Sequence, residues 1–98
     1  MRYIVKVSTY AKADRNGITE YLAQFSAATP IKFERELRKC IEIVGDMPNI
    51  FSKYSSNPNY RHVVVFGSYI MFYVVDEKDK TVFIYRILHG SQDIVNIL

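Results

Sequence analysis

The chain has 98 residues, enough for one hydrophobic core but too few for two, so residues 1–98 are predicted to form a single domain. Apolar residues make up 49% of the chain and charged residues 23%, a composition that excludes the disordered and fibrous classes. The net charge of +3 is compatible with an acidic partner or a nucleic acid, but it is specific to neither.

The first predicted element is a strand at residues 2–7, in which Tyr3, Val5 and Val7 fall on one side. Ser8 is placed to cap a helix, because its hydroxyl can accept a hydrogen bond from a free N–H group of the first turn. We expect that helix at residues 9–25. Its apolar stripe has the spacing i, i+3, i+4 and i+7 and consists of Ile18, Tyr21, Leu22 and Phe25.

A second helix is predicted to start at Thr29 and Pro30, with Thr29 as N-cap and Pro30 in the first position, where its missing N–H does no harm. Gly45 and Pro48 are expected to end it. Its apolar stripe consists of Phe33, Leu37, Cys40, Ile41 and Val44. Because residues 26–28 form a very short connection, the two helices must pack antiparallel as a hairpin.

Residues 49–60 are predicted to form a surface loop, and three strands follow at residues 61–66, 69–75 and 82–88. Gly67 and Ser68 mark the first turn between them, and the polar residues 76–80 mark the second. The first two of these strands are apolar on both faces, which indicates central strands covered on both sides. The helical hairpin can cover one face of the sheet, and the missing second cover indicates a partner protein. The predicted fold class is α+β: an N-terminal strand, an antiparallel two-helix hairpin and a three-stranded antiparallel meander that form a small sheet.

Three polar residues near the predicted sheet could carry chemistry: Arg61, Arg86 and His89. A histidine that transfers a proton, together with arginines that hold a phosphate, is the smallest set able to cleave RNA through its 2′-hydroxyl. Arg61 and His62 point to opposite faces, so only one of them can join such a site. Taken alone, Arg86, flanked by Ile84 and Leu88 on its own face, is better explained as a structural arginine paired with a carboxylate. His89 can equally be a turn or capping residue.

Neither a metal nor a cofactor is predicted. His62, His89 and Cys40 lack partners at metal-ligand spacing, and no glycine-rich phosphate loop occurs. Cys40 lies on the apolar stripe of the second helix. Because it is the single cysteine of the chain, no internal disulfide can form, which suits a reducing cytosol. The chain shows no secretory leader and no long apolar run. We therefore expect a cytoplasmic protein with no membrane contact.

In order and spacing, these segments resemble the toxins of the RelE/ParE superfamily from bacterial type II toxin–antitoxin modules. The resemblance covers nearly the whole chain and makes it one toxin domain. It is carried by residues 8–14 after the first strand, by the helix that closes with Asp46-Met47-Pro48, and by residues 67–75. The segment from Arg86 to Ile94, with His89-Gly90-Ser91-Gln92-Asp93 after the last strand, is the most specific part and is similar to the ParE branch.

The resemblance implies a neutralising antitoxin as partner and leaves two targets to consider. RelE-like members cleave messenger RNA on the ribosome with basic residues in the central strands, whereas ParE-like members poison DNA gyrase and are not nucleases. Here Val63, Val64, Val65 and Phe66 stand where an RNA-cutting member would carry basic residues, and the chain ends in Asn96-Ile97-Leu98 without a terminal tyrosine. The sequence therefore favours a ParE-like gyrase poison that arrests growth, of the kind associated with plasmid stabilisation.

Three hypotheses follow from this resemblance. In the leading one the protein is no enzyme, and it binds gyrase through the exposed part of the helical hairpin and through a set of polar residues: Arg61, Arg86, His89, Gln92 and Asp93. In the second it is a ribosome-dependent endoribonuclease in which Arg61 and Arg86 hold the phosphate and His89 is the general acid. In the third it is a superfamily member that has lost toxicity and only binds a neighbouring protein.

Overall fold

The computed structural model describes residues 2–98 and has the predicted α+β architecture. Its elements, in chain order, are β1 (Ile4–Val7), α1 (Thr9–Ala23), α2 (Ala28–Asp46), β2 (Arg61–Val65), β3 (Tyr69–Asp76), β4 (Thr81–His89) and α3 (Ile94–Ile97). The N-terminal strand, the helical hairpin and the meander are therefore confirmed. The short helix α3 was not predicted from the sequence. No helix within residues 2–98 is both long and apolar enough to cross a bilayer.

The four strands form one sheet in the order β1-β4-β3-β2. Strands β2, β3 and β4 pair antiparallel, and β1 lies parallel to β4 with Ile4 opposite Thr81. The expectation that residues 61–66 form a central strand is wrong, because β1 joins the far edge of the sheet and leaves β2 with one neighbouring strand. Val64 of β2 is accordingly 56% exposed. An apolar run therefore does not by itself make a central strand.

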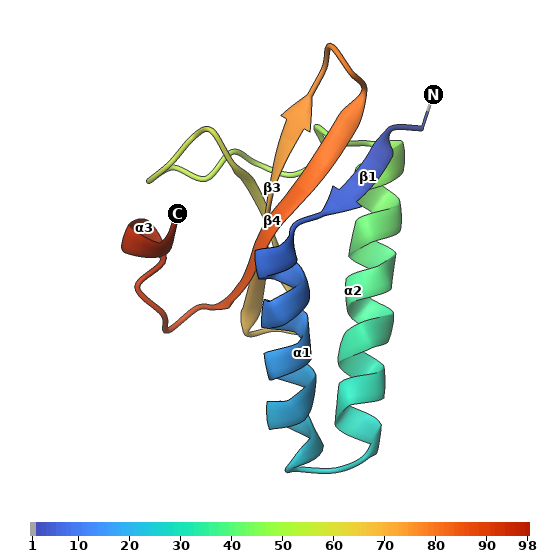
Figure 1. Ribbon diagram of the computed structural model, residues 1–98, viewed down its shortest axis with the longest axis vertical. Coiled ribbons are helices and arrows are strands. Elements are labelled where there is room, and N and C mark those ends of the chain that lie inside the picture. Colours follow the sequence, from blue (N-terminus) through green and yellow to red (C-terminus); the bar gives the residue numbers. More distant parts are fainter. Residues whose placement is uncertain (1) are drawn as a thin grey trace.

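The helices α1 and α2 lie side by side and antiparallel, as Figure 1 shows. Ser8 caps α1 as predicted: its hydroxyl oxygen accepts from the Ala11 N–H at 3.0 Å, and its O–H donates to the Tyr85 carbonyl at 2.5 Å. The ion pair between Arg15 and Glu34 joins the two helices. One serine thus fixes both the start of α1 and its place beside β4.

The predicted apolar stripe of α1 is correct for Ile18 and Leu22 only. The helix ends at Ala23, and Tyr21 and Phe25 are 52% and 65% exposed. Their rings do not enter the core but contact each other edge to face, with 5.3 Å between the ring centroids. The reason is geometric: a short helix pressed against both α2 and β4 buries a narrow strip, here Ala11 and Leu22.

The start of α2 also differs from the prediction. The helix begins at Ala28, so Thr29 and Pro30 lie inside its first turn, and the oxygen that accepts the Thr29 N–H at 3.2 Å belongs to Ser26. The stripe prediction holds, since Phe33, Leu37 and Val44 are buried and Cys40 and Ile41 pack against them. The helix continues through Gly45, where an added Cβ would lie 2.8 Å from Cζ of Arg2.

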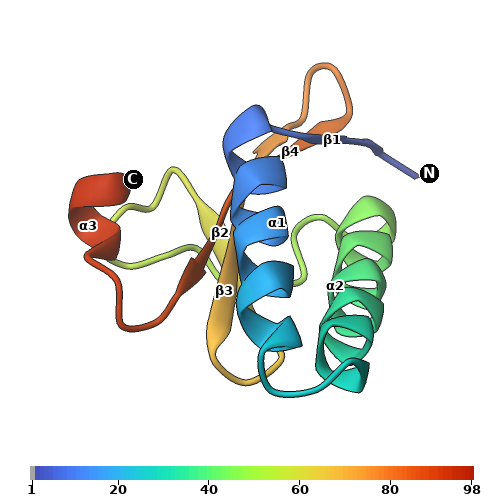
Figure 2. The same cartoon turned by 60° about the horizontal axis from the view of Figure 1, so that its bottom comes forward.

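The two faces of the sheet have different covers, which are seen from the side in Figure 2. The hairpin face packs against α1 and α2 around a core that includes Phe33, Leu37, Met71, Tyr73, Val82 and Ile84. The tail face carries a smaller cluster of Phe72, Leu88 and Ile94, to which Tyr54, Tyr60, Ile70, Ile97 and Leu98 add their side chains. The expectation that this face lacks a cover within the chain is therefore wrong, because residues of the 49–60 loop and of the C-terminal segment lie on it.

A β-bulge in β4 changes which face its side chains reach. Phe72 is opposite Arg86, but the next residue, Tyr73, is opposite Ile84, so Tyr85 is an extra residue on β4. Ile84 consequently belongs to the hairpin-face core and Leu88 to the tail-face cluster. The expectation that Arg86 shares a face with both of them is wrong, since an inserted residue breaks the alternation of a strand.

Candidate functional site

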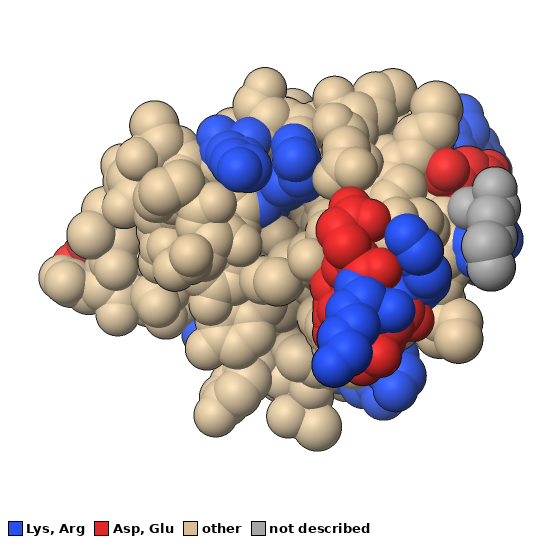
Figure 3. All heavy atoms as spheres, turned by 90° about the horizontal axis from the view of Figure 1, so that it is seen from above, with Lys and Arg blue, Asp and Glu red and all other residues tan. Residues whose placement is uncertain are grey.

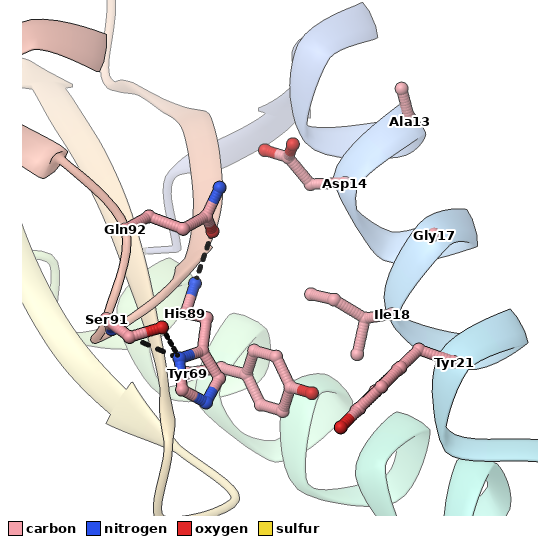
Figure 4. Close-up of a pocket in the computed structure, with 9 residues that line it drawn as sticks. All are labelled: Ala13, Asp14, Gly17, Ile18, Tyr21, Tyr69, His89, Ser91 and Gln92. Atoms are coloured by element: carbon pink, nitrogen blue, oxygen red, sulfur yellow. Dashed lines mark hydrogen bonds between the residues drawn. The ribbon is translucent and has the colours of Figure 1, made fainter. Parts of the chain in front are cut away.

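Between the C-terminal end of β4 and the side of α1 lies an open cavity of about 490 Å³. Five residues of α1, one of β3 and three at or after the end of β4 line it, as drawn in Figure 4: Ala13, Asp14, Gly17, Ile18, Tyr21, Tyr69, His89, Ser91 and Gln92. Gly17 leaves room at the helix surface, because nothing lies within 4 Å of where its Cβ would be. Of the predicted site residues, His89 and Gln92 lie in this cavity.

His89 is held in one orientation by its own turn. Its ring contacts Tyr69 edge to face at 5.3 Å, and its Nδ1 lies 3.1 Å from the Ser91 backbone N–H and 2.7 Å from the Ser91 hydroxyl. A backbone N–H can only donate, so Nδ1 is an acceptor and the neutral ring carries its proton on Nε2. His89 is therefore both the turn residue that its position suggested and a cavity residue with a free N–H donor.

Gln92 closes the same turn. Its side-chain oxygen accepts the backbone N–H of His89 at 2.7 Å, which fixes the orientation of the amide. Figure 4 shows its amide nitrogen on the side away from His89. The turn 89–92 thus presents a second N–H donor group next to α1.

Arg86 is paired with Asp14 at the rim of the cavity. Its Nε and Nη2 donate to the two carboxylate oxygens of Asp14 at 2.8 and 2.9 Å, and the Ile87 backbone N–H donates to Oδ2 at 3.0 Å. The hydrogen bonds to Asp14 raise the pKa of Arg86 above its ordinary value. The guanidinium also lies over the Tyr10 ring, 5.8 Å from its centroid. The structural role suggested for Arg86 is confirmed, and its partner is Asp14.

Arg61 lies far from this cavity. It is opposite Tyr73 on β3, whereas His89 is opposite Tyr69, so the two are separated by roughly 13 Å along β3 and by two strand spacings of about 5 Å each. The Arg61 guanidinium donates to the Phe51 carbonyl at 2.7 Å and lines a separate hollow of about 280 Å³ with Lys53 and Glu77. The structure therefore does not bring Arg61, Arg86 and His89 together.

Asp93 is exposed and lies outside the cavity, where its Oδ2 accepts from the Asn96 side chain at 2.6 Å. Within residues 2–98 no group of three or more His, Cys, Asp or Glu side chains could hold a metal ion. The other seven residues that line the cavity were not among the predicted site residues: Ala13, Asp14, Gly17, Ile18, Tyr21, Tyr69 and Ser91. Only Asp14 had a usable signal, because Arg86 was expected to need a carboxylate partner.

The charges at one end of the molecule are mixed. Figure 3 looks onto the end that carries the β3–β4 turn and shows acidic and basic side chains next to each other, with a separate basic patch nearby. Ion pairs there join Lys80 to Glu77 at 3.7 Å and Arg2 to Asp46 at 2.7 Å. Because the opposite charges offset each other, this end is no continuous phosphate-binding surface.

Comparisons with known proteins agree with this architecture. Residues 5–94 match the family model of the ParE toxin of the type II toxin–antitoxin system parDE. No curated protein matched the chain in a sequence search.

Solved structures have the same fold at low sequence identity. A chain of the chromosomal ParDE system of Pseudomonas aeruginosa is 18% identical and has a TM-score of 0.75, with 90% of this chain and 96% of that chain covered. A mutant of the toxin RelE of Escherichia coli in the free state is 17% identical with a TM-score of 0.66, over 99% of this chain and 93% of that one. The RelBE2 complex of Mycobacterium tuberculosis is 20% identical with a TM-score of 0.57, over 91% and 99%. With the family model matched over almost its entire length, the chain belongs to the ParE toxins of type II toxin–antitoxin systems, within the RelE/ParE superfamily.

Proposed function

We propose that the protein arrests growth by binding DNA gyrase and trapping its cleaved DNA, without catalysing a reaction of its own. The observation that carries this proposal is the match of residues 5–94 to the ParE toxin family, since gyrase poisoning is the activity associated with ParE-like members. The target-binding residues remain the predicted ones, among which His89 and Gln92 share a cavity and Arg86 lies at its rim.

The placement of the basic residues supports binding over RNA cleavage. Cleavage through a 2′-hydroxyl needs charge stabilisation next to the group that transfers the proton. Here Arg86 already donates to both oxygens of Asp14, and Arg61 lies on the other side of β3 from His89. Neither guanidinium is free beside the imidazole, so the geometry lacks that combination.

A cognate antitoxin is the second part of the proposal. Solved relatives of the same fold include the toxin–antitoxin complexes RelBE2 of Mycobacterium tuberculosis and RelBE of Escherichia coli. We expect a small acidic protein, encoded next to this one, to bind the toxin and suppress its effect on gyrase. Such partners commonly lay an extended or helical segment along the toxin surface and fold as they bind.

The test is a gyrase supercoiling and DNA-cleavage assay with antitoxin-free protein. Loss of supercoiling together with accumulation of cleaved DNA is the expected result, and addition of the antitoxin should reverse it. The variant Gln92→Ala changes one of the proposed target-binding residues and should weaken the effect on gyrase. Gln92 is exposed, so this substitution leaves both cores intact. Unaffected gyrase, from protein that still stops growth, would overturn the proposal.

The same preparation distinguishes the two remaining hypotheses. Cleavage of messenger RNA on added ribosomes, abolished by His89→Ala with antitoxin binding retained, would establish the endoribonuclease. Normal growth of cells that accumulate soluble antitoxin-free protein would establish a member that has lost toxicity. Both outcomes contradict gyrase poisoning.

A further inference from the structure

We propose that the cavity between α1 and the turn 89–92 binds a carboxylate side chain of a partner protein, with a large apolar residue of the same segment seated on Tyr21 and Phe25. This assigns a ligand chemistry to the cavity of about 490 Å³. It requires neither gyrase nor a particular antitoxin, so it stands or falls separately from the function proposed above.

The one carboxylate in the cavity wall, that of Asp14, already has its hydrogen-bond donors. Asp14 accepts three hydrogen bonds, from Nε and Nη2 of Arg86 and from the Ile87 backbone N–H, at 2.8 to 3.0 Å. The bidentate pair also neutralises its charge. Asp14 therefore does not repel an incoming anion as an unpaired carboxylate would.

Four polar side chains of the cavity, those of His89, Gln92, Tyr21 and Tyr69, offer hydrogens, whereas the Ser91 hydroxyl donates its hydrogen to His89 Nδ1. The contact from the Ser91 N–H leaves the proton of the neutral His89 ring on Nε2, and the contact from the His89 N–H leaves the amide hydrogens of Gln92 free. The hydroxyls of Tyr21 and Tyr69 have no hydrogen-bond partner in the part of the chain that the structure describes, and Figure 4 shows them pointing toward each other. A carboxylate fits these donors, because it supplies two acceptor oxygens.

The apolar residue of the ligand is inferred from two exposed rings next to the cavity. Tyr21 lines the cavity, and Phe25 contacts it edge to face one turn further along α1. Both rings are more than half exposed, which is unusual for two adjacent large apolar side chains. Because this apolar strip continues from the cavity, it favours a peptide segment that carries the carboxylate next to an apolar residue over a free small carboxylate.

The probe is the dipeptide acetyl-Glu-Phe-amide, titrated into the full ¹⁵N-labelled chain made by cell-free synthesis. We expect chemical-shift changes at the Gly17 backbone amide and at the Gln92 side-chain amide. The isosteric control acetyl-Gln-Phe-amide should bind about tenfold more weakly, because it replaces charge-assisted hydrogen bonds by neutral ones. Acetyl-Glu-Ala-amide should also bind more weakly, because it lacks the aromatic ring.

Two variants locate the site. Gly17→Met should abolish binding by filling the cavity, whereas Gly17→Ala should retain it; neither substitution meets an atom within 4 Å at Cβ. Gln92→Glu keeps an oxygen for the His89 N–H but replaces the amide donor by a negative charge, so it should weaken the Glu peptide about tenfold and spare the Gln peptide. Equal affinity for the Glu and Gln peptides would overturn the carboxylate assignment. Binding that survives both Gly17→Met and Gln92→Glu would overturn the location, and equal affinity for the Phe and Ala peptides would overturn the apolar part.

Discussion

The hairpin face and the tail face of the sheet are both closed by the protein's own chain, but in different ways. On the hairpin face the amphipathic helix α2 buries Phe33, Leu37 and Val44 against the strands, and α1 adds Ala11 and Leu22. On the tail face the cover is irregular: residues of the 49–60 loop and of the C-terminal segment surround Phe72 and Leu88. The first cover is regular secondary structure, whereas the second depends on contacts of short segments that are not stable alone.

This difference has a consequence for the chain end. Chain ends usually contribute little core, so removal of residues 90–98 would be the simplest test of whether this segment carries toxicity. That premise is wrong here, because Ile94 is buried and Ile97 and Leu98 pack on the tail-face cluster. Truncation would expose Phe72 and Leu88, so single substitutions are the better probes of the segment.

The largest effect is expected from opening the hairpin face. Phe33→Ala removes a ring that is fully buried and contacts Phe66 and Tyr69 edge to face. We expect a loss of about 3–5 kcal/mol in the free energy of unfolding, measured by urea denaturation. Ile31→Ala, two residues away and 60% exposed, is the control and should change it by about 0.5 kcal/mol or less. Similar losses for both would mean that α2 packs by another face.

The next effect tests the contact between α1 and β4. Asp14→Ala leaves the mostly buried guanidinium of Arg86 and the Ile87 N–H without their acceptor. We expect a loss of about 2–3 kcal/mol in unfolding free energy. The double variant Asp14→Ala, Arg86→Met should recover part of it, since no unpaired charge remains. Strictly additive losses would contradict the proposed pairing.

The dependence of stability on alkaline pH tests whether the Tyr73 hydroxyl is buried in the hairpin-face core. The Tyr73 hydroxyl donates to the Pro48 carbonyl at 2.9 Å, and burial raises the pKa of Tyr73 to about 12 from 10.0. The unfolded chain loses this proton near pH 10 and the folded protein only near pH 12. The stabilisation is therefore complete below pH 10 and declines as the pH rises toward 12.

The matched variant is Tyr73→Phe, which lacks the titrating group. It should be less stable at neutral pH, because the buried Pro48 carbonyl loses its donor. Between pH 10 and 12 it should lose about 2 kcal/mol less than the unsubstituted protein, measured by denaturation at each pH. An identical slope in both proteins would show that Tyr73 titrates as in the unfolded chain.

The smallest effect is expected on the tail face. Ile94→Ala should cost about 1–2 kcal/mol, less than a core truncation on the hairpin face, because α3 is a single turn near the chain end and can relax around the gap. Hydrogen exchange should show faster exchange of the α3 amides with little change in α2. Val95→Ala, at a neighbouring position that is 62% exposed, should leave exchange unchanged. Faster exchange throughout the sheet would show that the two faces are not independent.

The sequence by itself determined the order of the four strands and of α1 and α2, and the buried stripe of α2. Three signals are local, so they can be interpreted without knowledge of the rest of the chain. They are the helical spacing of apolar residues from Phe33 to Val44, the capping hydroxyl of Ser8 and the turn at Gly67. Ser8 and Gly67 lie in segments that carried the resemblance to the superfamily, whereas the segment from Arg86 to Ile94 carried the resemblance to the ParE branch, which the family match confirms.

The tertiary structure alone decided which edge β1 occupies, that Tyr85 forms a bulge, that the chain end covers Phe72, and that Asp14 joins Arg86 beside His89. Each of these depends on contacts between residues far apart in the sequence. Asp14 and Arg86 are 72 positions apart, and no periodicity or spacing relates them. The cavity lies between α1 and the end of β4, two elements that such long-range contacts bring together. Sequence patterns could therefore supply His89 and Gln92 as candidates, but not the cavity that holds them.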